Sequence, residues 1–232
     1  MRPASICIFF ISLLLCGGLW AQEEVAPDSL KVKDQKYGIR VGTDLLKLGR
    51  TLFESGYTGF EIQGDIRFSR KWFAAVELGT DDREWDKDGL IANTNGSYFK
   101  LGADFNAYEN WEGMNNAILV GLRYGFASFS QELIEYRVYT TDTTFPTSVV
   151  ESGQTFDGLT ASWAELIVGI KAEIWNNLFL GVNVQLKHLI AEDRPDNFDN
   201  LIIPGFNRTY DSSDWGVGLG YTISYLIPII KR

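Results

Sequence analysis

Residues 59–69 read GFEIQGDIRFS, a stretch in which apolar and polar side chains alternate. The even-numbered positions are apolar apart from Gly64, and the odd-numbered positions from Glu61 to Arg67 are all polar or charged. Because successive side chains of a β-strand point to opposite faces, this pattern predicts a strand with one apolar and one polar face. The other strands of the chain decide which of the two faces meets lipid.

The same alternation returns along the chain, and it predicts eight strands at residues 37–46, 59–69, 72–80, 97–107, 117–129, 162–174, 178–189 and 214–227. The links after the second, fourth and sixth strands are short to moderate, whereas those after the first, third, fifth and seventh are longer. Short turns at one end, long loops at the other and an even number of strands are typical of bacterial transmembrane barrels. We therefore predict an all-β fold, an eight-stranded antiparallel up-and-down transmembrane β-barrel over residues 37–232.

The first 21 residues, MRPASICIFFISLLLCGGLWA, have the pattern of a secretory signal peptide with cleavage before Gln22. Their apolar run is about half of the roughly 20 residues that a spanning helix needs. Residues 22–36 are polar without an apolar period, and we interpret them as a flexible periplasmic segment. Both cysteines, Cys7 and Cys16, lie in the signal peptide, so the predicted mature chain has no disulfide and no cysteine metal site.

The charge of the chain argues against a nucleic-acid partner. Asp and Glu number 30 against 21 Lys and Arg, which gives a net charge of −9. A protein that binds nucleic acid needs a basic surface to neutralise phosphates, and no basic stripe is present.

The polar face of the predicted strands suits the inside of a narrow barrel. In the last strand it offers mainly Gly216, Gly218 and Gly220, too sparse a set for a surface in water, and an eight-stranded lumen has just enough room for side chains. Buried charges must be paired. We therefore predict a charge-paired lumen with the apolar face toward lipid, formed by Arg40, Asp44, Glu61, Asp65, Arg67, Glu77, Lys100, Asp104, Arg123, Glu165, Lys171, Glu173 and Lys187.

Aromatic residues gather near the ends of the predicted strands. Membrane barrels carry aromatic side chains at both interfaces between membrane and water. We expect such a girdle from Tyr37, Trp72, Trp163, Trp175, Trp215 and Tyr225.

The closing segment GVGLGYTISYLIPIIKR (residues 216–232), the alternating strands and the signal peptide ending in Ala-Gln resemble small eight-stranded bacterial outer-membrane β-barrel proteins, specifically a family without an assigned function. The resemblance implies a bacterial outer-membrane location and insertion by the barrel-assembly machinery, and it brings no catalytic residues. Assembly signals of such proteins commonly end on an aromatic residue, whereas Leu-Ile-Pro follows Tyr225 here. We expect Pro228 to close the last strand because proline cannot donate to the ladder, which leaves Tyr221 and Tyr225 as the signal aromatics.

His188 is the only histidine of the chain and lies near the long-loop end of its strand. One alternative function is therefore a lipid-modifying barrel enzyme that uses His188 and a loop carboxylate for acyl transfer or ester hydrolysis. We prefer a residue at the rim of the barrel, and assign no catalytic residue, cofactor or metal. A second alternative is a soluble secreted lipocalin-like carrier, in which the apolar face encloses an apolar ligand.

Two long links mix aromatic and acidic side chains, at residues 133–145 (LIEYRVYTTDTTF) and 196–210 (DNFDNLIIPGFNRTY). Binding residues often lie on such loops, although residues 134–141 equally suit an extension of the barrel above the membrane. Residues 84–89, EWDKDG, resemble the start of a calcium loop, but Asn95 stands where an acidic ligand is needed, so we interpret them as a solvated acidic loop.

These patterns together predict an integral outer-membrane barrel with a structural or surface-binding role and both termini in the periplasm. Its expected partners are outer-membrane lipid, the barrel-assembly machinery and an extracellular ligand or protein at the long loops. A pore for large solutes is excluded, because aqueous channels need roughly 16 or more strands.

Overall fold

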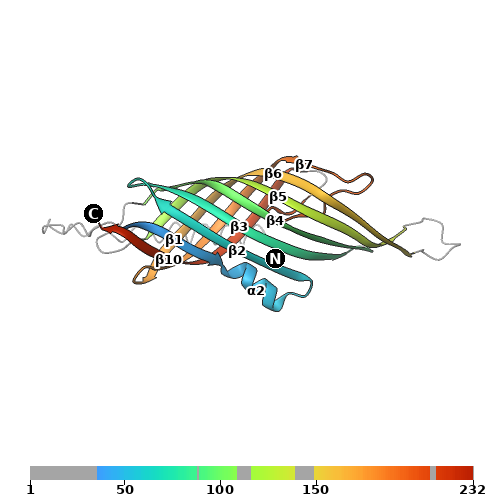
Figure 1. Ribbon diagram of the computed structural model, residues 1–232, viewed down its shortest axis with the longest axis horizontal. Helices are drawn as coiled ribbons and strands as arrows, with labels where there is room; N and C mark the ends of the chain where they lie inside the picture. The colour runs from blue at the N-terminus through green and yellow to red at the C-terminus, as the bar shows by residue number, and fades with distance from the viewer. Residues whose placement is uncertain (1–35, 88, 109–115, 139–148, 210–212, 232) are drawn as a thin grey trace, which may run out of the picture. The chain divides into compact units, whose positions relative to one another are not determined.

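Figure 1 shows a computed structural model of the protein, which describes residues 36–87, 89–108, 116–138, 149–209 and 213–231. In these residues eight antiparallel strands follow one another around a closed barrel, and the last pairs with the first. The prediction of an eight-stranded antiparallel barrel is therefore confirmed. The barrel strands are β1 (Lys36–Asp44), β2 (Tyr57–Arg67), β3 (Trp72–Lys87), β4 (Leu90–Asn106), β5 (Ala117–Arg137), β6 (Val149–Trp175), β7 (Leu178–Glu192) and β10 (Trp215–Lys231).

Three smaller elements accompany the barrel. The helix α2 (Leu45–Phe53) follows β1, and a two-stranded sheet of β8 (Ile202–Ile203) and β9 (Asn207–Arg208) lies between β7 and β10 in the chain. Within the described ranges, no helix is long and apolar enough to cross a membrane. The predicted signal peptide and the segment from residue 22 to residue 35 lie outside the described residues.

The two faces of the barrel wall differ in chemistry. Phe60 and Ile62 on β2 are 49% and 42% exposed, whereas Glu61 between them is 4% exposed. Large apolar side chains are likewise exposed on the other barrel strands, and charged side chains that alternate with them, such as Glu77, Lys100 and Glu165, are buried. An apolar outside and a polar inside are the arrangement of a transmembrane barrel. A soluble carrier would have the opposite arrangement, with the apolar face inside. The alternative of a lipocalin-like carrier is therefore wrong for this chain.

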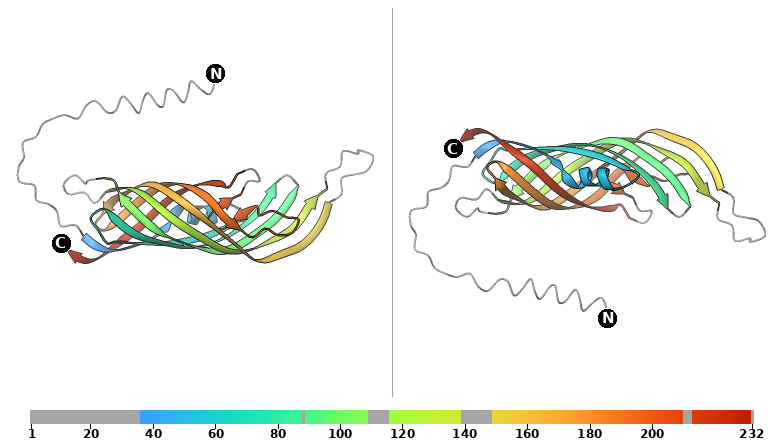
Figure 2. Two further views of the ribbon diagram at one scale, coloured as in Figure 1. Left: turned by 90° about the horizontal axis from the view of Figure 1, so that it is seen from above. Right: turned by 90° about the horizontal axis from the view of Figure 1, so that it is seen from below.

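Several strands extend further than the sequence predicted. β3 continues to Lys87 and β4 begins at Leu90, so most of the expected long third loop is a hairpin that turns at Gly89, with a φ of +75°. The acidic residues at 84–87 are therefore part of a strand. β5 and β6 pair up to the Arg137–Val149 contact, and Figure 2 shows this hairpin reaching past the other strands. The physical reason is that polar strand pairs are stable in water when inward side chains such as Thr94 and Gln131 are buried.

The first strand ends two residues earlier than predicted, at Asp44. Its carboxylate accepts hydrogen bonds from the backbone N–H groups of Leu46 at 2.7 Å and Lys47 at 3.4 Å, which makes Asp44 the N-cap of α2. A capping side chain satisfies the backbone N–H groups that the first helical turn leaves without a partner. Leu45, expected on the outward face of a strand, is instead the first residue of this helix.

The helix α2 occupies a place in the barrel wall where β1 is missing (Figure 1). The pairing of β1 with β10 ends at Asp44 and Thr222. The part of β10 from Trp215 to Tyr221 therefore has no β1 partner. On the other side, the edge of β2 meets the helix through Thr51, whose hydroxyl accepts a hydrogen bond from the Gly59 N–H at 2.8 Å. A helical side chain thus replaces the strand partner that β2 lacks.

The prediction that Pro228 closes the last strand is wrong, because β10 continues to Lys231. Gly38 pairs with Pro228 and Tyr37 pairs with Ile230, so the register shifts at this position. The residue left out of the pairing is Ile229, next to Pro228, and proline is tolerated at such bulges because the regular ladder is already interrupted there.

We expect Asp44→Ala to lower the free energy of unfolding by about 1 kcal/mol, the usual loss for an N-cap. Asp44→Asn keeps an oxygen acceptor and should change the free energy of unfolding by only a few tenths of a kcal/mol. Urea titration of the detergent-solubilised protein measures both values. Equal destabilisation by the two variants would mean that the negative charge, and not the cap, is what α2 needs.

Candidate functional site

The centre of the lumen is the ammonium group of Lys100 on β4. Its Nζ lies 2.9 Å from Glu77 Oε2, 3.5 Å from Glu165 Oε1 and 3.8 Å from Glu61 Oε2. The three carboxylates come from β2, β3 and β6, and the Lys100 side chain is only 2% exposed. One cation therefore joins strands from opposite parts of the ring, in a place that water does not reach freely.

Further ion pairs extend from this centre. Arg123 lies between Glu77, at 3.2 Å from its Nε, and Asp104, at 2.7 Å from its Nη1. Asp65 accepts from Arg40 at 2.7 Å and from Lys171 at 2.8 Å. Because each of these carboxylates faces at least one cation, the charge burial that a filled lumen requires is compensated.

The structure brings most of the predicted lumenal charges into this lumenal charge network, namely Arg40, Glu61, Asp65, Glu77, Lys100, Asp104, Arg123, Glu165, Lys171 and Lys187. Three others have different contacts. Asp44 caps α2, the Arg67 guanidinium lies 4.8 Å from the centre of the Phe73 ring, and Glu173 accepts from the Asn177 N–H at 2.8 Å.

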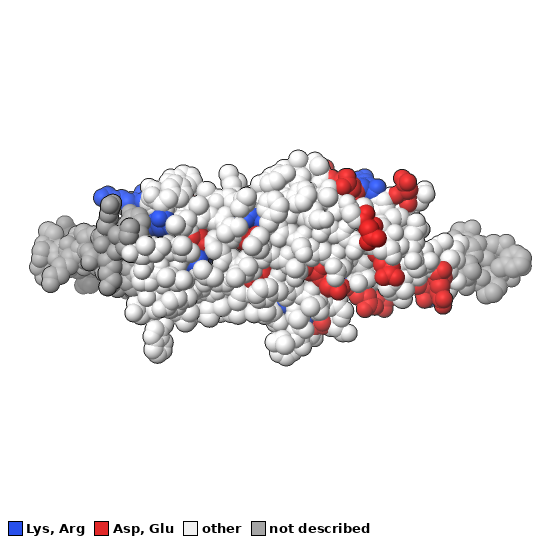
Figure 3. All heavy atoms as spheres, in the orientation of Figure 1, with Lys and Arg blue, Asp and Glu red and all other residues white. Residues whose placement is uncertain are grey.

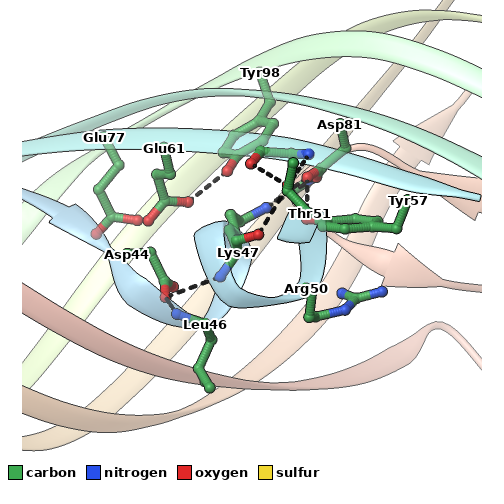
Figure 4. A network of polar contacts seen from close by, with 12 residues as sticks. Asp44, Leu46, Lys47, Arg50, Thr51, Tyr57, Glu61, Glu77, Asp81 and Tyr98 are labelled. Carbon is green, nitrogen blue, oxygen red and sulfur yellow. Dashed lines mark hydrogen bonds and ion pairs between the residues drawn. The ribbon is translucent and has the colours of Figure 1, made fainter. Parts of the chain in front are cut away.

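Sequence reasoning missed a second polar cluster beside α2. Lys47 Nζ lies 2.8 Å from Asp81 Oδ1, and the Tyr57 hydroxyl donates to the same oxygen at 2.8 Å. The Tyr98 hydroxyl donates to Glu61 and so connects this cluster to the lumenal charge network (Figure 4). Asp81 could have been found, since it shares the inward parity of Glu77 four residues earlier. Lys47 could not, because its position depends on a helix that alternation does not predict.

The segment between β7 and β10 folds into the barrel and closes the lumen. Ile203 and Phe206 are 0% and 2% exposed, and Phe206 packs edge-on against Trp163 with ring centres 5.9 Å apart. The backbone of Gly205 is held on both sides: its N–H donates to Asp81 at 2.9 Å and its carbonyl accepts from Lys187 at 2.7 Å. Part of an expected external loop is therefore an internal plug, residues 202–206.

Four of the expected girdle residues lie on the outer face. Trp72, Trp175, Trp215 and Tyr225 are between 45% and 77% exposed, and the side chain of Tyr37 lies outside the described residues. Trp163 differs from its expected place, since it is fully buried and its indole N–H donates to Glu165 at 3.1 Å. The signal was present in the sequence, because Trp163 has the inward parity of Glu165.

His188 lies on the outer face beside Trp215, its cross-strand partner. The two rings meet edge-on at 4.6 Å, with an angle of 89° between their planes. In the part of the chain that the structure describes, His188 has no hydrogen bond or ion pair with a serine or a carboxylate.

Acidic side chains gather at the end of the barrel where the hairpins extend (Figure 3). Exposed carboxylates there belong to both the β3–β4 and the β5–β6 hairpins and include Glu84, Asp86, Glu132, Glu151 and Asp157. In the middle of the same view only small parts of charged side chains show between uncharged atoms, as expected for a surface in contact with hydrocarbon. Among the described residues, no group of three His, Cys, Asp or Glu side chains could hold a metal ion.

A closed antiparallel ring with an apolar exterior and a charged, filled interior defines the protein as an integral transmembrane β-barrel. Within that class, the chain belongs to the family described as Domain of unknown function (DUF6048), whose model matches residues 1–232.

Solved structures that are similar to the chain include those of two proteins. One is Ail, the attachment invasion locus protein of Yersinia pestis, at 9% identity and a TM-score of 0.39, with 83% of this chain and 98% of that chain covered. The other is a major outer membrane protein from Thermus thermophilus, at 15% identity, the same TM-score of 0.39 and the same coverage of 83% and 98%. No curated protein matches the chain.

We expect Lys100→Met to lower the free energy of unfolding by about 3 to 5 kcal/mol, because it leaves buried carboxylates without their shared cation. Adding Glu77→Gln to Lys100→Met should restore part of the loss. Arg70→Met, in the exposed β2–β3 turn, is the matched control and should be close to neutral. Urea titration gives the three values. A loss below about 1 kcal/mol for Lys100→Met would show that the lumen is hydrated and the network unimportant for stability.

Proposed function

We propose that this protein is a closed, non-catalytic barrel of the bacterial outer membrane, which holds a binding surface rigidly outside the membrane. The observation that carries the proposal is the filled lumen: ion pairs cross it and residues 202–206 seal it. A barrel of this kind does not conduct large solutes, so its role must lie on its surfaces.

The extended hairpins support a binding role. Gln131 on β5 is fully buried; its side-chain amide donates to the Asp199 carbonyl at 3.1 Å and its oxygen accepts from the Leu201 N–H at 3.1 Å. These bonds hold the loop before β10 against the β5–β6 hairpin. A surface that is ordered before a partner arrives loses less conformational entropy on binding.

A cavity of about 600 Å³ marks where a partner could bind on this surface. It lies between the β5–β6 hairpin and residues 196–198, and Tyr136, Phe156 and Phe198 contribute aromatic surface to it. Phe156 and Phe198 stack with ring centres 5.8 Å apart, so the cavity wall joins the hairpin to the loop. Asp196 lines the cavity, and the exposed acids Glu132 and Glu151 lie on the two strands of the same hairpin, which favours a partner with basic groups.

The placement of the two ends completes the proposal. Lys36 pairs with Lys231, so the described ends of the chain lie at the same end of the barrel, opposite the long hairpins. We infer that both termini are periplasmic and that the hairpins are extracellular, as in other bacterial barrels with short periplasmic turns.

Gel mobility and conductance test the closed, membrane-embedded barrel. The unboiled protein should migrate differently from the boiled protein, and it should stay in the membrane fraction after an alkaline wash. In planar bilayers it should give no open channel of the size that porins form. A steady large conductance would contradict the filled lumen, and a freely soluble protein would contradict the membrane location.

Single cysteines test the orientation, since the described residues contain none. Thr155→Cys in the exposed β5–β6 hairpin should react with an impermeant maleimide on intact cells, whereas Arg70→Cys should react only after lysis. The reverse pattern would show that the termini are extracellular. Labelling of both variants after lysis controls for expression.

A further inference from the structure

A cavity of about 630 Å³ opens through the barrel wall beside α2. It is lined from two sides: Val217 and Leu219 belong to the outer face of β10, whereas Lys100 and Lys187 belong to the lumen. A cavity with both kinds of lining connects the surface that faces lipid with the polar interior. We refer to it as the lateral opening.

The lateral opening exists because β1 ends early. β10 extends from Thr222 to Trp215 without a β1 partner, and its inward positions there are Gly216, Gly218 and Gly220, which have no side chain to fill the space. A Cβ on Gly218 would lie 2.5 Å from Gln185 Oε1 and 3.2 Å from Lys187 Nζ, so its backbone borders directly on buried polar groups. In the described residues, α2 makes no backbone hydrogen bond to this edge of β10.

One part of the lining is apolar and continuous with the outer surface. Val217 and Leu219 are 72% and 68% exposed, and Leu46 on α2 is 39% exposed. In Figure 4 the Leu46 side chain points away from the polar cluster of Lys47 and Asp81. These three side chains offer a hydrocarbon chain a path along the wall between the helix and β10.

The other part of the lining is rich in cations, of which Lys47 and Lys100 are already paired with carboxylates of the lumen. Five cations line the cavity, Lys47, Arg50, Arg83, Lys100 and Lys187, against two acids, Asp44 and Glu61.

Some of these cations have capacity for an anion. The Arg83 side chain is half-buried, and within the described part of the chain its guanidinium makes no hydrogen bond and has no carboxylate oxygen within 4.0 Å. Lys187 is 2% exposed, donates to the Gly205 carbonyl, and has its nearest carboxylate oxygen, on Glu165, 4.0 Å away. Arg50 pairs with the exposed Glu54 at 2.6 Å, a surface pair that a stronger anion can replace.

We propose that the lateral opening binds one acidic phospholipid of the surrounding membrane. The acyl chain lies along Leu46, Val217 and Leu219, and the phosphate is bound by Arg83 and Arg50 with Lys187 behind them. Phosphate fits this lining because arginine offers it paired N–H donors. The inference rests on the barrel being embedded in lipid, but not on the proposed binding surface at the hairpins.

Native mass spectrometry of the full-length protein tests this site with dioleoyl phosphatidylglycerol and dioleoyl phosphatidylcholine as probes. We expect one molecule of phosphatidylglycerol to bind at least about 10-fold more tightly than phosphatidylcholine, and Arg83→Gln to weaken phosphatidylglycerol binding about 10-fold. Arg70→Gln, the same charge change in an exposed turn, should have no effect. Leu46→Gln should weaken binding, whereas Leu52→Gln on the exposed side of the same helix should not.

Several outcomes would overturn the proposal. Equal affinity for the two lipids, or an Arg83→Gln variant that binds like the wild type, would exclude a phosphate site in the lateral opening. If glycerol phosphate binds as tightly as the lipid, the lateral opening is a site for a soluble anion and not for a phospholipid. A wild-type protein whose mobility shifts on heating but which binds no phosphatidylglycerol would refute this inference alone, whereas loss of that shift would refute the membrane barrel itself.

Discussion

Hydrogen bonding of the backbone in a medium without water is the constraint on which the rest of this structure depends. In hydrocarbon, each N–H and C=O group without a partner costs several kcal/mol, so a strand can cross only as part of a closed ring. Closure requires every strand edge to be satisfied, and strand ladders do this around most of the ring. Where β1 ends early, the Thr51 hydroxyl of α2 bonds to the edge of β2, but in the described residues α2 makes no backbone hydrogen bond to the edge of β10. The wall is weakest at that exception, which is also where its interior can be reached.

Closure also determines where the charges must lie. Once the outer face is apolar, the alternating positions point into a narrow lumen, and their charges must neutralise one another there. Lys100 does this for three carboxylates on three strands, so its removal would affect much of the ring. Replacing such a network by apolar residues is neutral or stabilising in some other proteins, so we expect its value to include the specificity of strand register. The backbone of the plug at residues 202–206 is bound by Lys187 of this network and by Asp81 of the polar cluster beside α2.

Much of the fold could be predicted from side-chain parity, because parity is a property of the strand itself. The inward positions of Lys100, Glu77 and Glu165 follow from it directly. Parity also indicated that Trp163 points inward, but its closeness to a strand end suggested a girdle instead. Asp44 and Lys47 were beyond this method: a helix that replaces a strand depends on where a neighbouring edge lies, and only the assembled ring defines that edge. The burial of Ile203 and Phe206 likewise depends on lumenal space that no local pattern contains.

The single seam between β1 and β10 has a consequence for how the barrel forms. Every other neighbouring pair of barrel strands is consecutive in the chain except β7 and β10, which residues 193–214 separate, whereas Lys36 and Lys231 come from opposite ends of the barrel sequence. Joining distant residues costs more chain entropy than joining near ones. The hairpins from β2 to β7 are therefore expected to assemble as a curved open sheet first, with the terminal seam closing last. Until the seam closes, α2 is flanked by the edge of β2 but not by the edge of β10. Docking of the helix and closure of the ring should therefore occur as one event.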